Sequence, residues 1–247
     1  MKRYFIELAY NGAGFHGWQI QPNGITIQEE LNKALTTLLQ EDIYVIGAGR
    51  TDTGVHASFY VAHFETDKEF CVEDFNLDHL VYKLNRILSR NIAIYKIYPV
   101  VENMHARFSA VSRTYKYYID KRKNPFTHTF AWKMHPLPDI ALMNEAAKIL
   151  FDYTDFTSFS KLHTDVNNNN CTLMQAYWEE TSEQLIFTIK ANRFLRNMVR
   201  AIVGTLVEVG QQRISINEFR QIIESKNRCK AGSSVPANAL FLTKIEY

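Results

Sequence analysis

Residues 26–64 read TIQEELNKALTTLLQEDIYVIGAGRTDTGVHASFYVAHF and contain, in order, a predicted helix, strand, loop and strand. Thr26 and Glu29 have the spacing of a capping box, in which a hydroxyl and a carboxylate satisfy N–H groups at a helix start. Apolar residues then recur every three or four positions, as a helix requires: Ile27, Leu31, Ala34, Leu35 and Leu38. Ile43–Ile46 and Phe59–Phe64 are predicted strands, with the loop Gly47–His56 between them.

The flanking segments extend this unit to the order βαββαβ. A strand is expected at Tyr4–Tyr10, a helix at Leu77–Leu88 and a strand at Ile92–Tyr98. The second half repeats the order with one extra helix: strand Thr114–Asp120, helix Ile140–Phe151, strands Leu173–Trp178 and Leu185–Ala191, helix Phe194–Val209, the extra helix from the capping box Ser215–Glu218 to about Ser225, and strand Leu240–Glu246.

This order predicts an α+β protein of two ferredoxin-like halves, each a mainly antiparallel sheet with helices on one face. Two such halves would leave an active-site cleft between them. We expect an N-terminal α+β domain at residues 1–108, which contains the Gly47–His56 loop. A C-terminal α+β domain is expected at 109–247, with the Thr114–Asp120 strand and the Phe194–Val209 helix.

Composition excludes several classes of protein. The 247 residues are 46% hydrophobic and 22% charged, as in an ordinary globular chain. A net charge of +2 excludes polyanion binding by bulk charge, but leaves room for a local basic cleft. The cysteines Cys71, Cys171 and Cys229 are odd in number and widely spaced, which argues against a disulfide framework and a structural zinc site. No stretch approaches 18 apolar residues, so we expect no membrane partner and a cytoplasmic location.

The loop Gly47–Ala57 contains a cation, an anion and two hydroxyl groups among its glycines. Three glycines in eight residues permit close approach of a ligand, and Arg50 stands two residues before Asp52. A purely structural alternative is a tight turn in which Asp52 accepts backbone hydrogen bonds. A P-loop is excluded, because no Gly-Lys-Ser/Thr follows and the next element is a strand.

The sequence Gly49-Arg-Thr-Asp52-Thr-Gly-Val-His-Ala57 resembles the catalytic motif of the TruA family of tRNA pseudouridine synthases. Further blocks agree with that family in order and spacing: Tyr10–Gly12, Phe15–Gln19, Thr26–Gln28, His105–Ala110, Arg113–Tyr117, Asp155–Phe159, Ala191–Asn192, Met198–Gly204 and Ala237–Leu240. The chain departs from the family pattern at three places: Asn91, Leu195–Asn197 and Ser233–Ser234.

The resemblance implies an isomerase that converts uridine to pseudouridine at positions 38, 39 and 40 of the tRNA anticodon arm. It implies that Asp52 is the catalytic carboxylate, that Tyr115 stacks on the target uracil and that Arg200 and Arg50 bind the substrate. It also implies a homodimer. No cofactor motif and no metal-ligand spacing occur among the histidines, so we expect neither a cofactor nor a metal. His56 is expected to shape the loop by hydrogen bonding.

Without the resemblance, Tyr115 and Arg200 have ordinary structural interpretations. Tyr115 lies in an alternating strand where at least one tyrosine belongs to the core. On the predicted helix Phe194–Val209, the residues Arg193, Asn197, Arg200 and Gly204 would share one face, which could simply be solvated. Arg193, Arg196 and the cluster Lys121, Arg122 and Lys123 are candidate contacts to the tRNA backbone.

Two other functions stay open at this stage. One is a catalytically silent RNA-binding protein on the same scaffold. The other is a nucleoside glycosidase, which would release free uracil from the RNA.

Overall fold

The computed structural model describes residues 1–68, 70, 76–161 and 168–247, and Cys71 lies outside them. Within these residues the chain divides into two compact units. The first unit comprises 1–111 and 242–247, and the second comprises 112–241. The division falls a few residues after the expected boundary at 108/109, and the last six residues join the first unit instead of the second.

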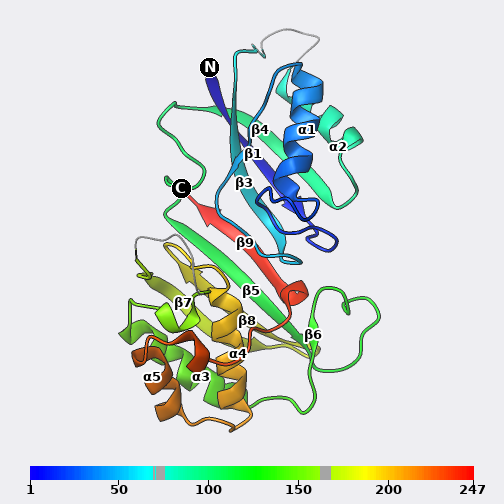
Figure 1. The fold of residues 1–247 in the computed structure, drawn as a ribbon. Helices are drawn as coiled ribbons and strands as arrows, with labels where there is room; N and C mark the ends of the chain where they lie inside the picture. The colour runs from blue at the N-terminus through cyan, green and yellow to red at the C-terminus, as the bar shows by residue number, and fades with distance from the viewer. Residues whose placement is uncertain (69, 71–75, 162–167) are drawn as a thin grey trace. The chain divides into compact units, whose positions relative to one another are not determined.

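The first unit contains strands β1 to β4 and helices α1 and α2, followed at the chain end by most of β9. The bounds are β1 Lys2–Tyr10, α1 Ile27–Leu39, β2 Ile46–Gly47, β3 His56–Thr66, α2 Leu77–Ile87, β4 Ile92–Val100 and β9 Leu240–Glu246. Strand β1 pairs antiparallel with β3 and β4, β2 pairs with β3, and β9 lies beside β3 (Figure 1). The first half therefore has the predicted βαββαβ order in a mainly antiparallel sheet.

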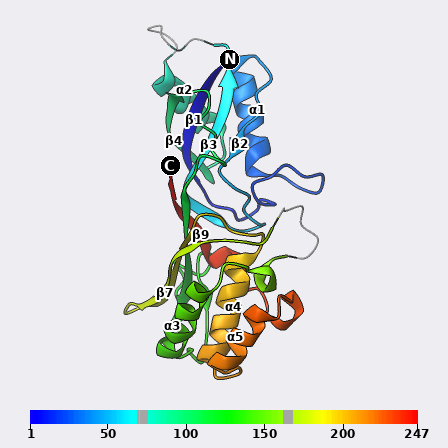
Figure 2. The ribbon, with the colours of Figure 1, turned by 90° about the vertical axis from the view of Figure 1, so that its left-hand side faces the viewer.

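The second unit contains strands β5 to β8 and helices α3 to α5. The bounds are β5 Ser112–Asp120, β6 Trp132–Lys133, α3 Ile140–Ile149, β7 Leu173–Glu180, β8 Gln184–Ala191, α4 Met198–Gly210 and α5 Ile216–Glu224. Strand β8 pairs antiparallel with β5 and with β7, and the short β6 pairs parallel with β5. Figure 2 shows α3, α4 and α5 gathered on one side of these strands. Both units are thus mixed α+β, as the sequence predicts.

Local chemistry explains where the helices begin. Asp139 accepts hydrogen bonds from the N–H groups of Ala141 and Leu142 at the start of α3. Ser215 and Glu218 form the predicted capping box at the start of α5. At α1 only half of the predicted box forms. The Thr26 hydroxyl accepts from Glu29 N, but the Glu29 carboxylate pairs with Lys33 at 2.6 Å.

The predicted strand Ile43–Ile46 is wrong for its first three residues, because β2 contains only Ile46–Gly47. Side chains of α1 satisfy the backbone of this segment in place of a neighbouring strand. Gln28 Nε2 donates to Val45 O at 2.7 Å, and Asn32 Oδ1 accepts from Val45 N at 2.9 Å. A stretch with a strand-like apolar pattern is therefore held as an irregular connection.

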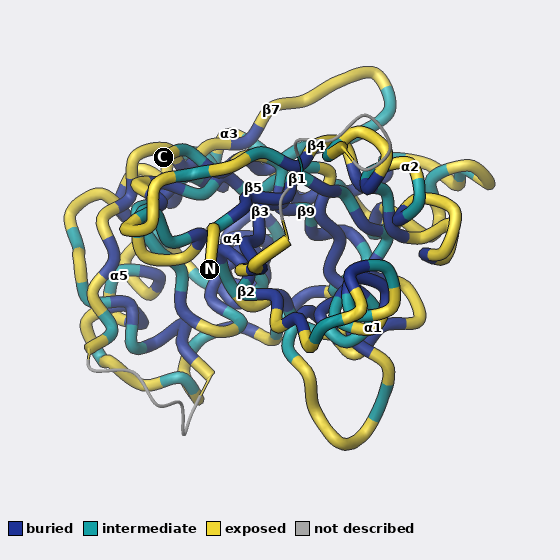
Figure 3. Tube along the Cα trace, turned by 90° about the horizontal axis from the view of Figure 1, so that it is seen from above, coloured by how far each residue is buried: buried dark blue, intermediate teal, exposed yellow. Residues whose placement is uncertain are grey.

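The core of each unit lies between its sheet and its helices. Most of β1 and β3 is buried, as Figure 3 shows by its dark colouring. In the second unit α4 is buried almost along its whole length, and only Arg200 and Glu208 of its thirteen residues are more than slightly accessible. These rigid elements support the loops that contain the predicted site residues.

Candidate active site

Asp52 lies in the connection between β2 and β3, at the position that the sequence predicts. The side chain is half-buried, and its backbone carbonyl accepts a hydrogen bond from Val55 N at 3.1 Å. This bond closes a turn over residues 52–55. The turn fixes the backbone on which the carboxylate stands, while Arg50 two residues earlier is exposed.

The Asp52 loop rests on the segment that follows β1. Trp18 N donates to Thr51 O at 3.3 Å, and the Tyr10 hydroxyl and Thr51 Oγ1 share a hydrogen bond of 2.9 Å. Gly17 has a φ of +83°, and a Cβ on it would lie only 2.3 Å from Thr51 O. The approach of the two segments therefore requires glycine at position 17.

Aromatic side chains pack against the first part of the loop. Trp18 and Tyr60 stack with ring centroids 4.3 Å apart, and Tyr10 meets Tyr60 at 5.5 Å. The Tyr60 hydroxyl donates to Gly49 O and accepts from Gly49 N. Buried rings thus hold the backbone immediately before Arg50.

His56 shapes the loop, as predicted. Its side chain is completely buried, and Nδ1 accepts a hydrogen bond from Gly12 N at 2.9 Å. An accepting Nδ1 bears no proton, so the neutral ring has its proton on Nε2. The imidazole joins the start of β3 to the segment after β1.

Tyr115 lies in β5, opposite Ile189 of β8, and is half-buried. Its ring meets Phe194 edge-on at a centroid distance of 5.1 Å. Tyr117, two residues further along and on the same face of the strand, is completely buried. Of the two tyrosines, Tyr117 is the core residue and Tyr115 retains access to its surroundings.

The helix predicted at Phe194–Val209 begins four residues late. Helix α4 starts at Met198, and Asn197 before it has a left-handed backbone with a φ of 67°. Arg193 and Asn197 therefore do not share a helical face with Arg200. Arg200 lies in the first turn of α4, is half-buried, and donates from Nε to Val235 O at 2.7 Å.

The basic candidates differ in their surroundings. Lys121 pairs with Glu180 at 2.6 Å, and Arg122 makes two hydrogen bonds of 2.8 Å to the Glu183 carboxylate. Lys123 is exposed and has no ion pair within the described residues. Arg193 and Arg196 lie in the loop before α4, where Arg193 is half-buried and Arg196 is exposed. Their contact with tRNA stays a prediction.

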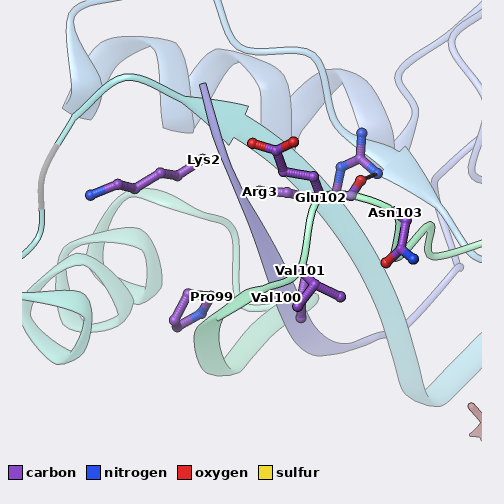
Figure 4. A pocket seen from close by; sticks show the side chains of 7 residues that line it. All are labelled: Lys2, Arg3, Pro99, Val100, Val101, Glu102 and Asn103. Atoms are coloured by element: carbon purple, nitrogen blue, oxygen red, sulfur yellow. Dashed lines mark hydrogen bonds between the residues drawn. The ribbon is translucent and has the colours of Figure 1, made fainter.

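One hollow on the first unit lies far from Asp52. It has a volume of about 700 Å³ and is lined by Lys2, Arg3 and residues 99–103 (Figure 4). Arg3 and Tyr10 lie at opposite ends of β1, about 23 Å apart at the rise of a strand. The Arg3 guanidinium is already bonded to Glu65 and to the carbonyls of Glu102 and Met104. This hollow therefore has no part in the Asp52 site.

No three His, Cys, Asp or Glu side chains gather as a metal site in residues 1–68, 70, 76–161 and 168–247. The absence of a metal requirement stays a prediction. No helix in the described part of the chain is long and apolar enough to cross a membrane.

Fold and loop together define an α+β protein that presents a single carboxylate from a glycine-rich connection between two strands. A family model described as tRNA pseudouridine synthase matches residues 146–247. The chain is 55% identical over 247 residues to tRNA pseudouridine synthase A of Parabacteroides distasonis, covering 100% of this chain and 96% of that protein. It is 57% identical over 248 residues to tRNA pseudouridine synthase A of Bacteroides fragilis, covering 100% and 97%. The protein of the same name from Chlorobaculum tepidum is 37% identical over 243 residues, with 98% and 96% covered.

The similarity to these three relatives covers at least 98% of this chain and at least 96% of each relative. The chain belongs to the tRNA pseudouridine synthase family. The fold expected from the order of the predicted elements, α+β with mainly antiparallel pairing, is the one found.

Sequence reasoning missed several residues that contact the predicted site residues within each unit. Thr51 anchors the loop through both its hydroxyl and its carbonyl, and Phe194 packs against Tyr115. Val235 bonds Arg200. Each of the three adjoins a residue that the sequence singled out, namely Asp52, Arg193 and Ser234. Val235 acts through its backbone, so its side chain gives no signal of its role.

Proposed function

We propose that this chain isomerises uridine to pseudouridine at positions 38 to 40 of the tRNA anticodon arm, with Asp52 as the catalytic carboxylate. The observation that carries the proposal is the position of Asp52. It is the one carboxylate in a loop whose backbone is fixed by Thr51, Trp18 and the 52–55 turn. Relatives named tRNA pseudouridine synthase A support the substrate and the reaction.

The chemistry needs few groups from the protein. The N1–C1′ bond of the uridine breaks, the uracil turns, and C5 bonds to C1′. C5 then loses its proton and N1 gains one, so the product is an isomer of the substrate. The catalytic carboxylate acts on the ribose of the target uridine. The nucleophilic carboxylate of a retaining glycosidase acts on its sugar in a similar way. A second carboxylic acid is not required, because the detached uracil spreads its charge over two carbonyl groups. A single aspartate in the loop is therefore sufficient.

Tyr115 and Arg200 are proposed to bind the target nucleotide, with Arg50 as a further substrate contact. Tyr115 suits base stacking because its ring is half-buried and braced edge-on by Phe194. Stacking of a base on an aromatic ring is worth ~1–3 kcal/mol. A target base that has left its helical stack needs such a partner.

Tests of this proposal start with the wild-type chain. Purified protein is incubated with a tRNA transcript without added metal, and pseudouridine is mapped by position. Pseudouridine at one or more of positions 38 to 40, with no free uracil, is the expected result. Free uracil would favour a glycosidase, and unchanged but tightly bound tRNA would favour a silent RNA-binding protein.

Asp52→Asn tests the carboxylate itself. The variant should form no detectable pseudouridine and should bind tRNA almost as well as the wild type, since phosphate contacts provide most of the affinity. Asp42→Asn makes the same chemical change at an exposed position ten residues earlier, and should be fully active. Substantial activity of Asp52→Asn would remove this residue from the chemistry.

The finer expectations are part of the same proposal. A tRNA substrate agrees with a cytoplasmic location. The homodimer rests on the family resemblance, and light scattering of the purified chain at several concentrations measures it directly.

A further inference from the structure

The Gly232–Pro236 segment leads from α5 toward β9 (Figure 1). Side chains from several parts of the second unit bond to it. Gly232 N donates to the buried Thr205 Oγ1 at 3.0 Å. Ser234 Oγ accepts from Asn197 Nδ2 at 2.6 Å and from Arg228 Nη2 at 2.9 Å. A Cβ on Gly204 of α4 would lie 2.0 Å from Ser233 O, so the segment is pressed against the helix backbone.

Two hydrogen bonds join this segment to Arg200. Val235 N donates to the Arg200 carbonyl at 3.3 Å, and Arg200 Nε donates to the Val235 carbonyl at 2.7 Å. The second bond restrains the guanidinium, because Nε and its hydrogen lie in the guanidinium plane. The position of Val235 therefore limits the directions in which the two terminal nitrogens of Arg200 can point.

The next carbonyl along the chain is bonded by Tyr117. Its hydroxyl donates to Pro236 O at 3.0 Å, and its ring is completely buried. Burial raises the pKa of Tyr117 above its usual range, so the hydroxyl keeps its proton and remains a donor. Tyr117 and Arg200 thus donate hydrogen bonds to adjacent carbonyl groups of the same segment.

We propose that Tyr117 is a positioning residue, whose hydroxyl fixes the Val235–Pro236 backbone and thereby the orientation of the Arg200 guanidinium. Tyr117 lies two residues after Tyr115 on the same face of β5. The bonds through Pro236 and Val235 therefore keep the strand of Tyr115 and the side chain of Arg200 in one fixed arrangement. The inference rests on the proposed function, because Arg200 is a substrate contact only within it.

Tyr117→Phe removes the hydroxyl and keeps the buried ring. Pro236 is exposed, so water can replace the hydroxyl on its carbonyl, and the melting temperature should change little. Water is a less rigid anchor than a buried side chain. Misplacement of a positioning group by about 1 Å can cost ~100-fold in rate. We expect the single-turnover rate at saturating enzyme to fall roughly 10-fold or more, with the affinity for tRNA nearly unchanged.

Tyr118→Phe is the matched control, since it deletes the same atom one residue further along, on the opposite face of β5. Its rate should equal that of the wild type. Arg200→Lys should also be slow, because lysine has no Nε–H to bond Val235 in this way. When Tyr117→Phe is added to Arg200→Lys, the single-turnover rate should fall by less than about 2-fold further. Two substitutions that disturb the same network of contacts are expected to be non-additive in this way.

Each outcome decides one question. A wild-type chain that forms no pseudouridine refutes the proposed function. An active wild type with a normal rate for Tyr117→Phe, or with a full additional loss in the Arg200→Lys background, refutes the positioning role alone. If Tyr117→Phe does not fold, Ser234→Ala takes its place, because it removes the hydrogen bonds of the same segment to Asn197 and Arg228. Ser234→Ala must then lower the single-turnover rate, and this loss must be non-additive with that of Arg200→Lys.

Discussion

Gly17→Ala should damage both the stability of the first unit and the rate of catalysis. The residue has a φ of +83°, a conformation that costs a non-glycine residue ~1–2 kcal/mol. Its new Cβ would lie 2.3 Å from Thr51 O. Real Cβ contacts are essentially never under 3.0 Å, so that oxygen must retreat by roughly 0.7 Å through a well-packed region. Overpacking of this kind costs a further ~1–3 kcal/mol.

Gly14→Ala separates the two effects. Gly14 has nearly the same φ, +82°, but a Cβ there meets nothing within 4 Å. We therefore expect Gly14→Ala to lose only the ~1–2 kcal/mol of backbone strain and to keep its rate. Gly17→Ala should lose ~2–5 kcal/mol in total, from strain and overpacking together.

The rate distinguishes a displaced loop from a weakened fold. Thr51 directly precedes Asp52, so a shift approaching 1 Å should slow pseudouridine formation by ~10- to 100-fold. Thermal melting gives the stability, at ~2–4 °C per kcal/mol for a chain of this size. Single-turnover assays well below the melting temperature give the rate. Equal melting temperatures for the two variants, or a wild-type rate for folded Gly17→Ala, would refute the view that this contact positions Asp52.

Two further predictions concern protonation and salt. Burial, with His105 and Arg3 nearby, lowers the pKa of His63 to about 4, so stability present above pH 6.5 is lost as the pH falls toward 4. Denaturant titrations should show a loss of about 2 kcal/mol from this group between pH 7 and pH 5, and a smaller one in His63→Asn. Lys123→Gln should make the salt dependence of tRNA affinity shallower by about one phosphate contact. Lys121→Gln and Arg122→Gln should change it less, because each cation already meets a glutamate, and equal slopes for all three variants would contradict this reasoning.

The sequence predicted helix starts well where a side chain caps the helix. Ser215 and Asp139 are N-cap residues, and the side chain of each accepts hydrogen bonds from backbone N–H groups in the first turn of its helix. The start of α4 was predicted wrongly for a related reason. Leu195 is buried although it lies outside the helix, so it continues the apolar period through a loop. The left-handed Asn197 that ends this loop has no signature in the periodicity.

The reactive residues of the Asp52 loop can be recognised in the sequence. The contacts that hold this loop in place cannot. The blocks Tyr10–Gly12 and Phe15–Gln19 are remote from Asp52 along the chain. In the fold they supply the Tyr10 hydroxyl, the Trp18 N–H and the close approach of Gly17. Such contacts between distant segments depend on the pairing of β1 with β3, which periodicity alone cannot give.

The departures from the family pattern become intelligible through their contacts. Asn197 and Ser234 belong to two separate departures, yet Asn197 Nδ2 donates to Ser234 Oγ at 2.6 Å. The two changes therefore support each other within this chain, and the segment that fixes Arg200 remains bonded. At the third place, Asn91 acts through its backbone carbonyl, which accepts from Asn11 N at 2.8 Å. Any residue provides that carbonyl, so the contact between the residue before β4 and the segment after β1 does not depend on the side chain at position 91.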